Sequence, residues 1–302
     1  MFSGGGFHKE YRPSFLLCPK SSGHGGDGER PHGLSRGLDA IRGADGIRFG
    51  NGGDSPKHEG HDRGKDVCPS YIVGGKVVTT RVCLVRHGST VLSVEDRFAG
   101  ITNAALSDQG REQARSLAKR LSKESLSAFY ASPLDRTMET ASILAKPHEK
   151  PVEPQPAFRE IDHGVWEGLT RNEAERKYVQ MYSRWEADPF NYSPEGGESG
   201  LAVTARAMPA LLSLVEKHAG QMICVVSHKA TIRLLLSAVL GFDPRTYRDH
   251  LDLSPASLSI LDFRDTCHGR LAVFNDVAHY AKDGGAIPPP PEGRLSKVWG
   301  KV

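Results

Sequence analysis

The pattern of hydrophobic and polar positions changes near Val77. Residues 1–76 hold many glycines, charges of both signs and few large apolar side chains, so we predict a disordered Gly-rich extension that cannot gather a core. From Val77 onward, short apolar runs alternate with amphipathic stretches, which is typical of an α/β domain. Residues 281–302 contain Pro288–Pro291 and predict a flexible tail. The folded domain is therefore expected at 77–280.

The apolar runs predict strands, and the stretches with a helical period predict helices. In the first helix, expected to begin at the N-cap Ser107, apolar residues recur at 114, 117, 118 and 121. The predicted strands are 82–85, 126–130, 222–226, 258–263 and 271–274. Further helices are predicted after Arg136, at about 173–187, at about 201–218, and from Ile232 to a C-terminal stop at Gly241. Because strands and helices alternate, we predict a three-layer α/β fold with a largely parallel central sheet and helices on both faces.

Reactive side chains follow three of the predicted strands. Arg86 and His87 come directly after the first strand, Arg136 follows the second, and His228 follows the third, just before a helix. Glu160 lies in a loop that mixes acids, a histidine and an aromatic residue. Each residue also has an ordinary structural explanation, such as a helix ion pair for Arg136 or a satisfied buried position for His228. Five separate structural explanations at element ends would require five coincidences, whereas one shared site explains all five residues. We therefore predict that these side chains meet in a pocket.

These five residues fit phosphoryl transfer through a phosphohistidine. A neutral imidazole nitrogen is a competent nucleophile at neutral pH. Arg86, Arg136 and a protonated His228 would hold the phosphate oxygens and stabilise the charge of the transition state. Glu160, kept protonated by the neighbouring anion, would give a proton to the leaving oxygen and later activate water.

Other kinds of active site fit less well. No serine sits in a Gly-x-Ser-x-Gly elbow, Ser89 has no matching acid nearby, and a P-loop is absent. The acids at element ends, in Asp162-His163 and Asn275-Asp276, have poor spacing for a metal ion. The five histidines of residues 1–76 are expected to be solvated, because nothing fixes their spacing. We therefore expect neither a metal nor another cofactor.

Charge and cysteine content indicate which partners and which cellular compartment to expect. The net charge of +3 gives no broad basic field for nucleic acid, and no apolar stretch reaches the ~20 residues that span a bilayer. The five cysteines form no CxxC pair, and Cys83 and Cys224 lie in apolar runs, which indicates free thiols in a reducing compartment. We predict a soluble cytoplasmic protein without a secretion signal. Because Glu10 is the single acid of the first 26 residues, an organelle transit peptide stays open as an alternative.

Taken in order, the motifs resemble those of the histidine phosphatase superfamily, also called phosphoglycerate mutase-like, over about residues 80–280. The matching stretches are Leu84–Thr90, Arg97–Gly100, Leu106–Ser107 with Gly110, Ser132–Leu134 with Arg136, Glu160, Gly164–Gly168, Gly196–Ser199 and Val226–His228. The resemblance implies that His87 is the phosphorylated nucleophile and Glu160 the proton donor. It also implies a phosphate pocket made by Arg86, Arg136 and His228, without a metal. Residues 77–280 would then be a histidine phosphatase catalytic domain.

Departures from the family pattern concern substrate binding. Leu92-Ser93 stands where many members have Trp-Asn, so a contact made there by asparagine falls to the Ser93 hydroxyl. Gly100 and Lys229 are further substrate-binding candidates. Lys229 replaces a common glycine and could face either the pocket or solvent, and Arg233 has the same alternatives with the solvated one favoured. Specificity is expected in the loops at 93–103 and 182–200.

The resemblance favours the phosphatase branch over the mutases. Mutases tend to carry a hydroxyl residue at the position of Ala99 and a long basic insertion between the glutamate and the second histidine, which are 68 positions apart here. We predict a metal-independent phosphomonoesterase acting on a small phosphorylated metabolite. A phosphoglycerate mutase and a non-catalytic scaffold for phosphorylated ligands are the alternatives. Neither nucleic acid nor a membrane is an expected partner, and monomer and homodimer both stay open.

Overall fold

The computed structural model describes residues 72–73, 76–94 and 97–281 of the chain, with side chains from residue 78 and without those of Ser93 and Val94. The predicted tail lies outside the described residues, and so does almost all of the predicted Gly-rich extension. The described part opens with a short antiparallel hairpin of β1 (Ile72–Val73) and β2 (Lys76–Val77).

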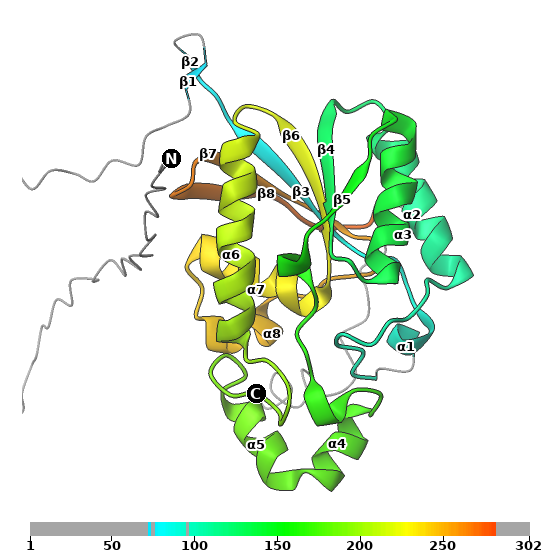
Figure 1. The fold of residues 1–302 in the computed structure, drawn as a ribbon, viewed down its shortest axis with the longest axis vertical. Helices are drawn as coiled ribbons and strands as arrows, with labels where there is room; N and C mark the ends of the chain where they lie inside the picture. Colours follow the sequence, from blue (N-terminus) through cyan, green and yellow to red (C-terminus); the bar gives the residue numbers. More distant parts are fainter. Residues whose placement is uncertain (1–71, 74–75, 95–96, 282–302) are drawn as a thin grey trace, which may run out of the picture. The chain divides into compact units, whose positions relative to one another are not determined.

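A six-stranded sheet forms the centre of the molecule (Figure 1), in the order β5-β4-β6-β3-β7-β8. Its strands are β3 (Thr80–Arg86), β4 (Leu126–Ala131), β5 (Val152–Pro154), β6 (Met222–Ser227), β7 (Leu258–Asp265) and β8 (His268–Asp276). The first four of these are mutually parallel, whereas β7 pairs antiparallel with β3, and β8 pairs antiparallel with β7. The prediction of a largely parallel sheet is confirmed.

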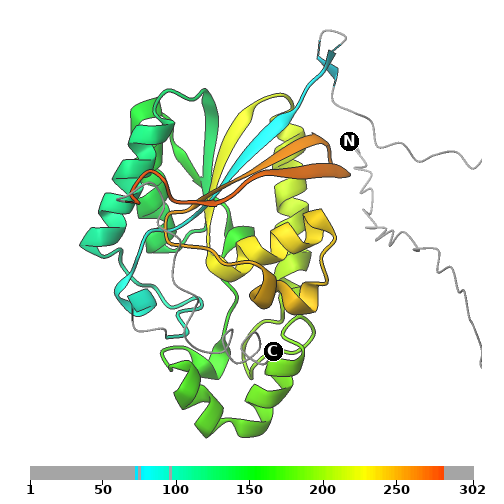
Figure 2. The same ribbon diagram turned by 180° about the vertical axis from the view of Figure 1, so that it is seen from behind.

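Helices cover both faces of this sheet, as Figures 1 and 2 show from opposite sides. Helices α2 (Asp108–Leu121) and α3 (Asp135–Ala145) pack on one face, and α6 (Gly200–Lys217) and α7 (Lys229–Leu240) pack on the other. Successive strand residues point to opposite faces. In β3, Val82 and Leu84 join the core under α6 and α7, while Cys83 and Val85 join the core under α2 and α3. This confirms the three-layer prediction.

A smaller helical part lies beyond the carboxyl ends of the parallel strands (Figures 1 and 2). It contains α4 (Arg171–Lys177) and α5 (Val179–Ala187), which pack around an aromatic core of Phe98, Trp166, Tyr182 and Trp185. The short helices α1 (Val91–Val94) and α8 (Tyr247–His250) complete the α-helices of the described residues. Four 3-10 turns also occur there, at Lys146–His148, Pro156–Phe158, Gly164–Trp166 and Pro244–Thr246.

Local signals set several helix ends. Ser107 and Ser199 accept hydrogen bonds from backbone N–H groups in the first turns of α2 and α6, and Gly241 ends α7 in the left-handed conformation. Two expectations were wrong. The single helix expected at 173–187 is interrupted at Tyr178, whose backbone is not helical, and β5 was absent from the predicted strands. Pro154 is tolerated because β5 is an edge strand, where a proline needs no ladder partner.

The cysteines only partly follow the prediction. Cys83 and Cys224 are free and buried, and burial raises the pKa of both thiols, so they pack as small hydrophobic side chains. Cys267, in the turn between β7 and β8, is disulfide-bonded. This bond was not expected for a protein of a reducing compartment.

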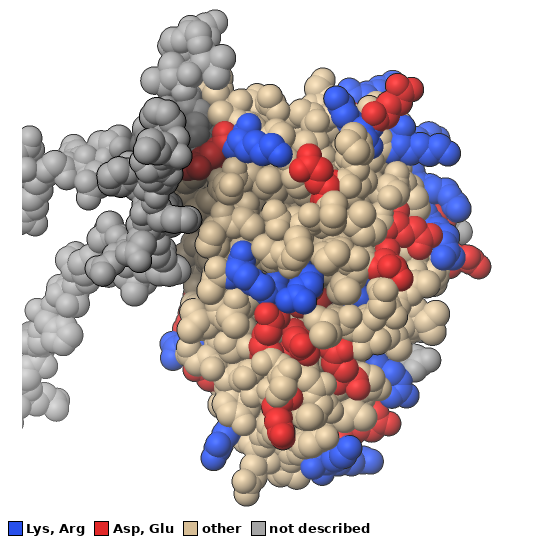
Figure 3. Space-filling view, viewed as in Figure 1, with Lys and Arg blue, Asp and Glu red and all other residues tan. Residues whose placement is uncertain are grey.

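None of the helices formed by residues 72–73, 76–94 and 97–281 is long and apolar enough to cross a membrane. On the face shown in Figure 3, lysine and arginine side chains are interspersed with aspartate and glutamate, so basic charge is not gathered into one broad surface there.

Candidate active site

Parallel pairing of β3 and β6 brings the two predicted histidines together. The strands pair in register up to Arg86 and Ser227, so the next residue of each chain segment leaves the sheet at the same level. The backbone N–H of His87 donates to the carbonyl oxygen of Ser227 at 3.0 Å. The two imidazole rings lie 5.2 Å apart between centroids, inclined by 60°. Both rings are almost fully buried. The structure therefore places His87 and His228 side by side, as predicted.

The hydrogen bond of His87 fixes its tautomer. Its Nδ1 lies 2.8 Å from the carbonyl oxygen of Gly88. Because a carbonyl oxygen only accepts, Nδ1 carries the proton and Nε2 keeps its lone pair. Burial, followed by the charges of Arg136 and Arg86, holds the pKa of His87 well below its usual range. His87 is therefore a neutral imidazole whose lone pair lies on Nε2.

Two glycines allow the loop after β3 to pack against the start of α2. A Cβ on Gly88 would lie 2.4 Å from the carbonyl oxygen of Gly110, and one on Gly110 would lie 2.2 Å from that of Ser89. Further hydrogen bonds secure the loop, since Gly88 N–H donates to Thr140 Oγ1 and Ser89 N–H donates to Gln113 Oε1. The position of His87 thus depends on backbone contacts that leave no room for a side chain.

Arg136 enters the site from the first turn of α3 and is 1% exposed. It donates to the carbonyl oxygens of Thr102 and Gly100, each at 2.8 Å. The loop that supplies these carbonyls is held by Glu167, which accepts from the backbone N–H groups of Ile101 and Thr102. Gly100, a predicted substrate-binding residue, has a φ of 43°, and a Cβ there would overlap Glu167 Oε1. In this structure Gly100 therefore supports Arg136.

Several buried nitrogens of the site lack acceptors. Arg86 donates through Nη1 to the carbonyl oxygen of Leu253 at 2.6 Å. Within the described part of the chain, no hydrogen-bond partner exists for Nε of Arg86, Nε of Arg136 or Nδ1 of His228. Burial lowers the pKa of both arginines, so their charges are held at a free-energy cost. Unpaired buried groups of this kind indicate a place for a ligand, and an oxyanion would supply the missing acceptors.

Glu160 is held at the amino terminus of α7. Its carboxylate accepts from the backbone N–H groups of Ala230 at 3.2 Å and Thr231 at 3.1 Å, and from Thr231 Oγ1 at 3.1 Å. The N–H of Ile161 also donates to it, at 3.0 Å. These donors fix the position of the carboxylate at the first turn of α7. Since α7 begins directly after His228, one helix terminus positions both His228 and Glu160.

The remaining predicted binding residues have mixed outcomes. The backbone of Ser93 lies in α1, but its side chain is outside the described residues. Lys229 is partly exposed and pairs with Asp252 at 3.2 Å, and Arg233 pairs with the same carboxylate at 3.2 Å. The favoured solvated position of Arg233 was wrong, because only 8% of this residue is exposed. Its partner Asp252 lies outside α7, so the helical pattern of the sequence could not reveal this ion pair.

Three residues of the site were not selected from the sequence as site residues. Ser132 Oγ lies 2.8 Å from His228 Nε2, Thr231 binds the carboxylate of Glu160, and Arg206 donates to the carbonyl oxygen of Glu160 at 3.0 Å. Ser132 follows β4 and could have been found from its strand-end position. Arg206 borders the buried stripe of α6, where an arginine is an unusual neighbour of core residues.

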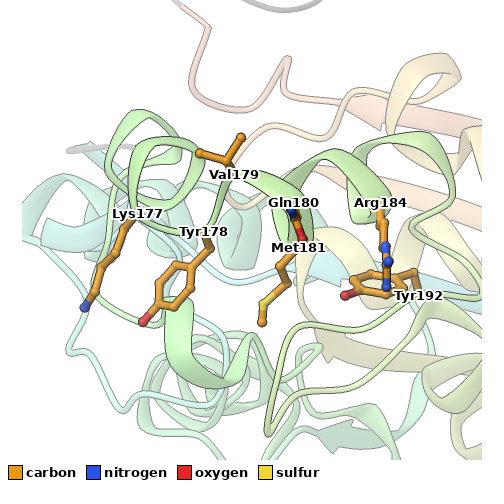
Figure 4. A pocket seen from close by; sticks show the side chains of 7 residues that line it. All are labelled: Lys177, Tyr178, Val179, Gln180, Met181, Arg184 and Tyr192. Carbon is orange, nitrogen blue, oxygen red and sulfur yellow. The ribbon is translucent and has the colours of Figure 1, made fainter.

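The described residues contain no group of three or more His, Cys, Asp or Glu that could hold a metal ion. A pocket of about 460 Å³ lies on α4, α5 and the segment after them, and Figure 4 shows its lining. Its lining residues are Lys177, Tyr178, Val179, Gln180, Met181, Arg184 and Tyr192. None of them belongs to the histidine site.

Comparisons with known proteins agree with this architecture, a three-layer α/β fold with a buried histidine pair at the carboxyl end of its sheet. A family model of the histidine phosphatase superfamily (branch 1) matches residues 82–277, and the chain belongs to this superfamily. The earlier resemblance is thereby confirmed. The enzyme is a phosphatase of the histidine phosphatase type.

Individual relatives match about two thirds of the chain. Phosphoserine phosphatase 1 of Hydrogenobacter thermophilus is 36% identical over 67% of this chain and 99% of its own length. The structure of YhfR from Bacillus stearothermophilus superposes with a TM-score of 0.63 at 31% identity, covering 66% of this chain and 98% of that one. A mycobacterial glucosyl-3-phosphoglycerate phosphatase gives a TM-score of 0.59 at 28% identity, covering 65% and 98% of the two chains.

Proposed function

We propose that the protein is a metal-independent phosphomonoesterase that acts on a small phosphorylated metabolite through a phosphohistidine on His87. The observation that carries this proposal is the state of His87, a buried neutral imidazole whose Nδ1 is tied to Gly88 and whose Nε2 is free. Around it, Arg86, Arg136 and His228 hold nitrogens without acceptors among the described residues. A phosphate group would meet a nucleophile and its charge-stabilising donors in the same place.

The reaction has two steps. In the first, Nε2 of His87 forms a bond to phosphorus while the bond from phosphorus to the ester oxygen breaks, and Glu160 gives that oxygen a proton. In the second, Glu160 takes a proton from water, the water oxygen bonds to phosphorus, and the bond to His87 breaks. Inorganic phosphate leaves and the imidazole is neutral again.

The electrostatic state of the site changes when the substrate arrives. In the ligand-free protein, burial, followed by Arg136 and His87, holds the pKa of His228 well below its usual range. A bound phosphate supplies the negative charge that favours protonated His228, which then donates to a phosphate oxygen. The first step needs Glu160 as the protonated acid beside this phosphate.

The test is phosphate release from a panel of esters in the presence of EDTA. L-Phosphoserine is the first substrate to include, because a relative carries the name phosphoserine phosphatase. We expect release without metal, an acid-labile phosphoenzyme in a quenched reaction, and loss of both in His87→Ala. Equal release by His87→Ala would rule out the phosphohistidine, and no release from any ester would favour a binding scaffold.

The mutase alternative has its own assay. A phosphoglycerate mutase exchanges 3- and 2-phosphoglycerate when 2,3-bisphosphoglycerate primes the histidine. We expect hydrolysis to exceed this exchange at equal enzyme concentration. Exchange that outpaces phosphate release would replace the phosphatase proposal by the mutase.

A further inference from the structure

Two basic side chains of α7 share one carboxylate beside the histidine site. Lys229 Nζ and Arg233 Nη2 each lie 3.2 Å from Oδ1 of Asp252. Lys229 directly follows His228, and Arg233 lies one helical turn further along α7. Asp252 directly precedes the residue whose carbonyl oxygen accepts the hydrogen bond of Arg86. The cluster is therefore connected through the backbone to both sides of the phosphate pocket.

This cluster carries more positive charge than its carboxylate can balance. Lys229 and Arg233 together face the single charge of Asp252, whose side chain is 69% exposed, whereas the side chain of Arg233 is only 10% exposed. Nε of Arg233 is buried and has no partner within residues 97–281 or the shorter described segments. Burial, then Arg233 and Arg86, lowers the pKa of Lys229 to about 8, and burial lowers that of Arg233 to about 10. The protein maintains a surplus cation there against the cost of desolvation.

We propose that Lys229 and Arg233 form a subsite for a carboxylate of the substrate, so that the preferred esters carry a carboxylate near the phosphate that is removed. The proposal rests on the phosphatase function proposed above and names its substrate class. Asp252 shows that the pair can hold a carboxylate oxygen between two cationic donors. The surplus of one positive charge matches a carboxylate rather than a second phosphate, which carries nearly two negative charges.

The test uses two pairs of esters that differ at one group. L-Phosphoserine and O-phosphoethanolamine differ only by the carboxylate, and 3-phosphoglycerate and glycerol 1-phosphate differ by carboxylate against hydroxymethyl. We expect kcat/KM to be at least about tenfold higher for the carboxylate member of each pair, as for a charge-assisted contact. Lys229→Gln should reduce this ratio about tenfold, whereas Lys229→Arg should retain most of it. Lys150 is an exposed lysine outside the site. Lys150→Gln should leave kcat/KM unchanged for both members of each pair.

Three further results test the carboxylate subsite. The wild-type ratio should fall as pH rises through about 8, since Lys229 then loses its charge, and it should not fall in Lys229→Arg. A ratio near one in both pairs, or a ratio unaffected by Lys229→Gln, would overturn the subsite. A larger ratio for fructose 1,6-bisphosphate over fructose 1-phosphate would assign the cluster to a second phosphate instead.

Binding measurements separate this proposal from the proposed function. If no ester is hydrolysed, the phosphatase proposal fails, but the subsite still predicts a ratio of dissociation constants. Titration calorimetry on His87→Ala should give at least about tenfold tighter binding of L-phosphoserine than of O-phosphoethanolamine, and this difference should shrink in the His87→Ala, Lys229→Gln double variant. Equal binding of both compounds would contradict the subsite whether or not the chain is catalytic.

Discussion

Arg206 holds the backbone of Glu160 in place. Its Nη2 donates to the carbonyl oxygen of Glu160 at 3.0 Å, and its Nη1 donates to the carbonyl oxygens of Ala157 and Arg159. The other edge of the guanidinium pairs with both carboxylate oxygens of Glu198. A helix on one side of the sheet thereby fixes the loop that supplies the proposed proton donor.

Replacing Arg206 should therefore slow the chemical step. We expect Arg206→Ala to lower kcat about 30- to 100-fold with less than a threefold change in KM, because a small displacement of Glu160 disturbs proton transfer more than binding. Arg206→Lys should resemble Arg206→Ala, since an ammonium group cannot reproduce the planar set of donors. Steady-state kinetics with p-nitrophenyl phosphate measures both constants.

A matched control is the exposed Arg245, which pairs with Asp243 on the surface. Arg245→Ala should keep kcat and KM. If Arg206→Ala raised KM and left kcat intact, Arg206 would act on substrate binding, and the positioning role would be wrong.

The close approach of Gly88 and Gly110 predicts a large effect of one methyl group. Gly110→Ala would place Cβ 2.2 Å from the backbone oxygen of Ser89, which cannot move without displacing the loop that follows His87. We expect a loss of about 3 kcal/mol in the free energy of unfolding and loss of phosphatase activity. Gly241→Ala is the control, because its φ of 71° is strained but nothing lies within 4 Å. It should cost only about 1 kcal/mol and keep activity, as measured by urea unfolding.

His163 predicts a pH-dependent stability. Burial, with smaller contributions from Arg171 and Arg248, lowers the pKa of His163 to about 3, while the unfolded chain keeps a value near 6.5. Below pH 6.5 the unfolded state therefore binds more protons, so stability is full above this pH and falls as the pH decreases toward 3. Each pH unit within this window costs about 1.4 kcal/mol per such histidine.

The test is the slope of unfolding free energy against pH between 5 and 6.5. His163→Phe keeps an aromatic ring against Phe98 and Trp185 and removes the titration. Its slope should be shallower than that of the wild type by about 1 kcal/mol per pH unit. Identical slopes for the two proteins would show that His163 titrates normally in the folded state.

Glu167 should influence phosphate binding through Arg136. It accepts hydrogen bonds from Ile101 and Thr102, and that loop supplies the carbonyl oxygens bound by Arg136. We expect Glu167→Ala to reduce kcat/KM about tenfold and to weaken inhibition by inorganic phosphate by a similar factor. Glu112→Ala, which removes an exposed surface ion pair, is the comparison. Unchanged phosphate inhibition in Glu167→Ala would show that this loop does not affect phosphate binding by Arg136.

The sequence predicted the framework of the site better than its details. Strand ends could be located because apolar runs such as 222–226 stop sharply at a polar residue, and this placed His87, Arg136 and His228 at one edge of the sheet. The anchoring of Glu160 could not be predicted, since its partners Ala230 and Thr231 are 70 and 71 positions away. The burial of Arg233 was missed for the same reason.

Short elements were also beyond sequence patterns. Strand β5 is three residues long and ends in a proline, so its period cannot be recognised, and only its pairing with β4 defines it. The interruption at Tyr178 lies within a continuous helical pattern and follows from the backbone conformation of a single residue. The tautomer of His87 depends on the direction of one carbonyl group, which no residue type specifies.

Helix α7 has a consequence for how such an enzyme could acquire new substrates. It anchors Glu160 through backbone N–H groups, which every residue except proline provides, whereas Lys229 and Arg233 act through their side chains. The subsite proposed above therefore predicts that substitutions at 229 and 233 alter selectivity while the anchoring amides stay as they are. A small library at these two positions, screened on esters with and without a carboxylate, is a direct route to redirecting the enzyme. Each member of that library would keep the residues proposed for catalysis.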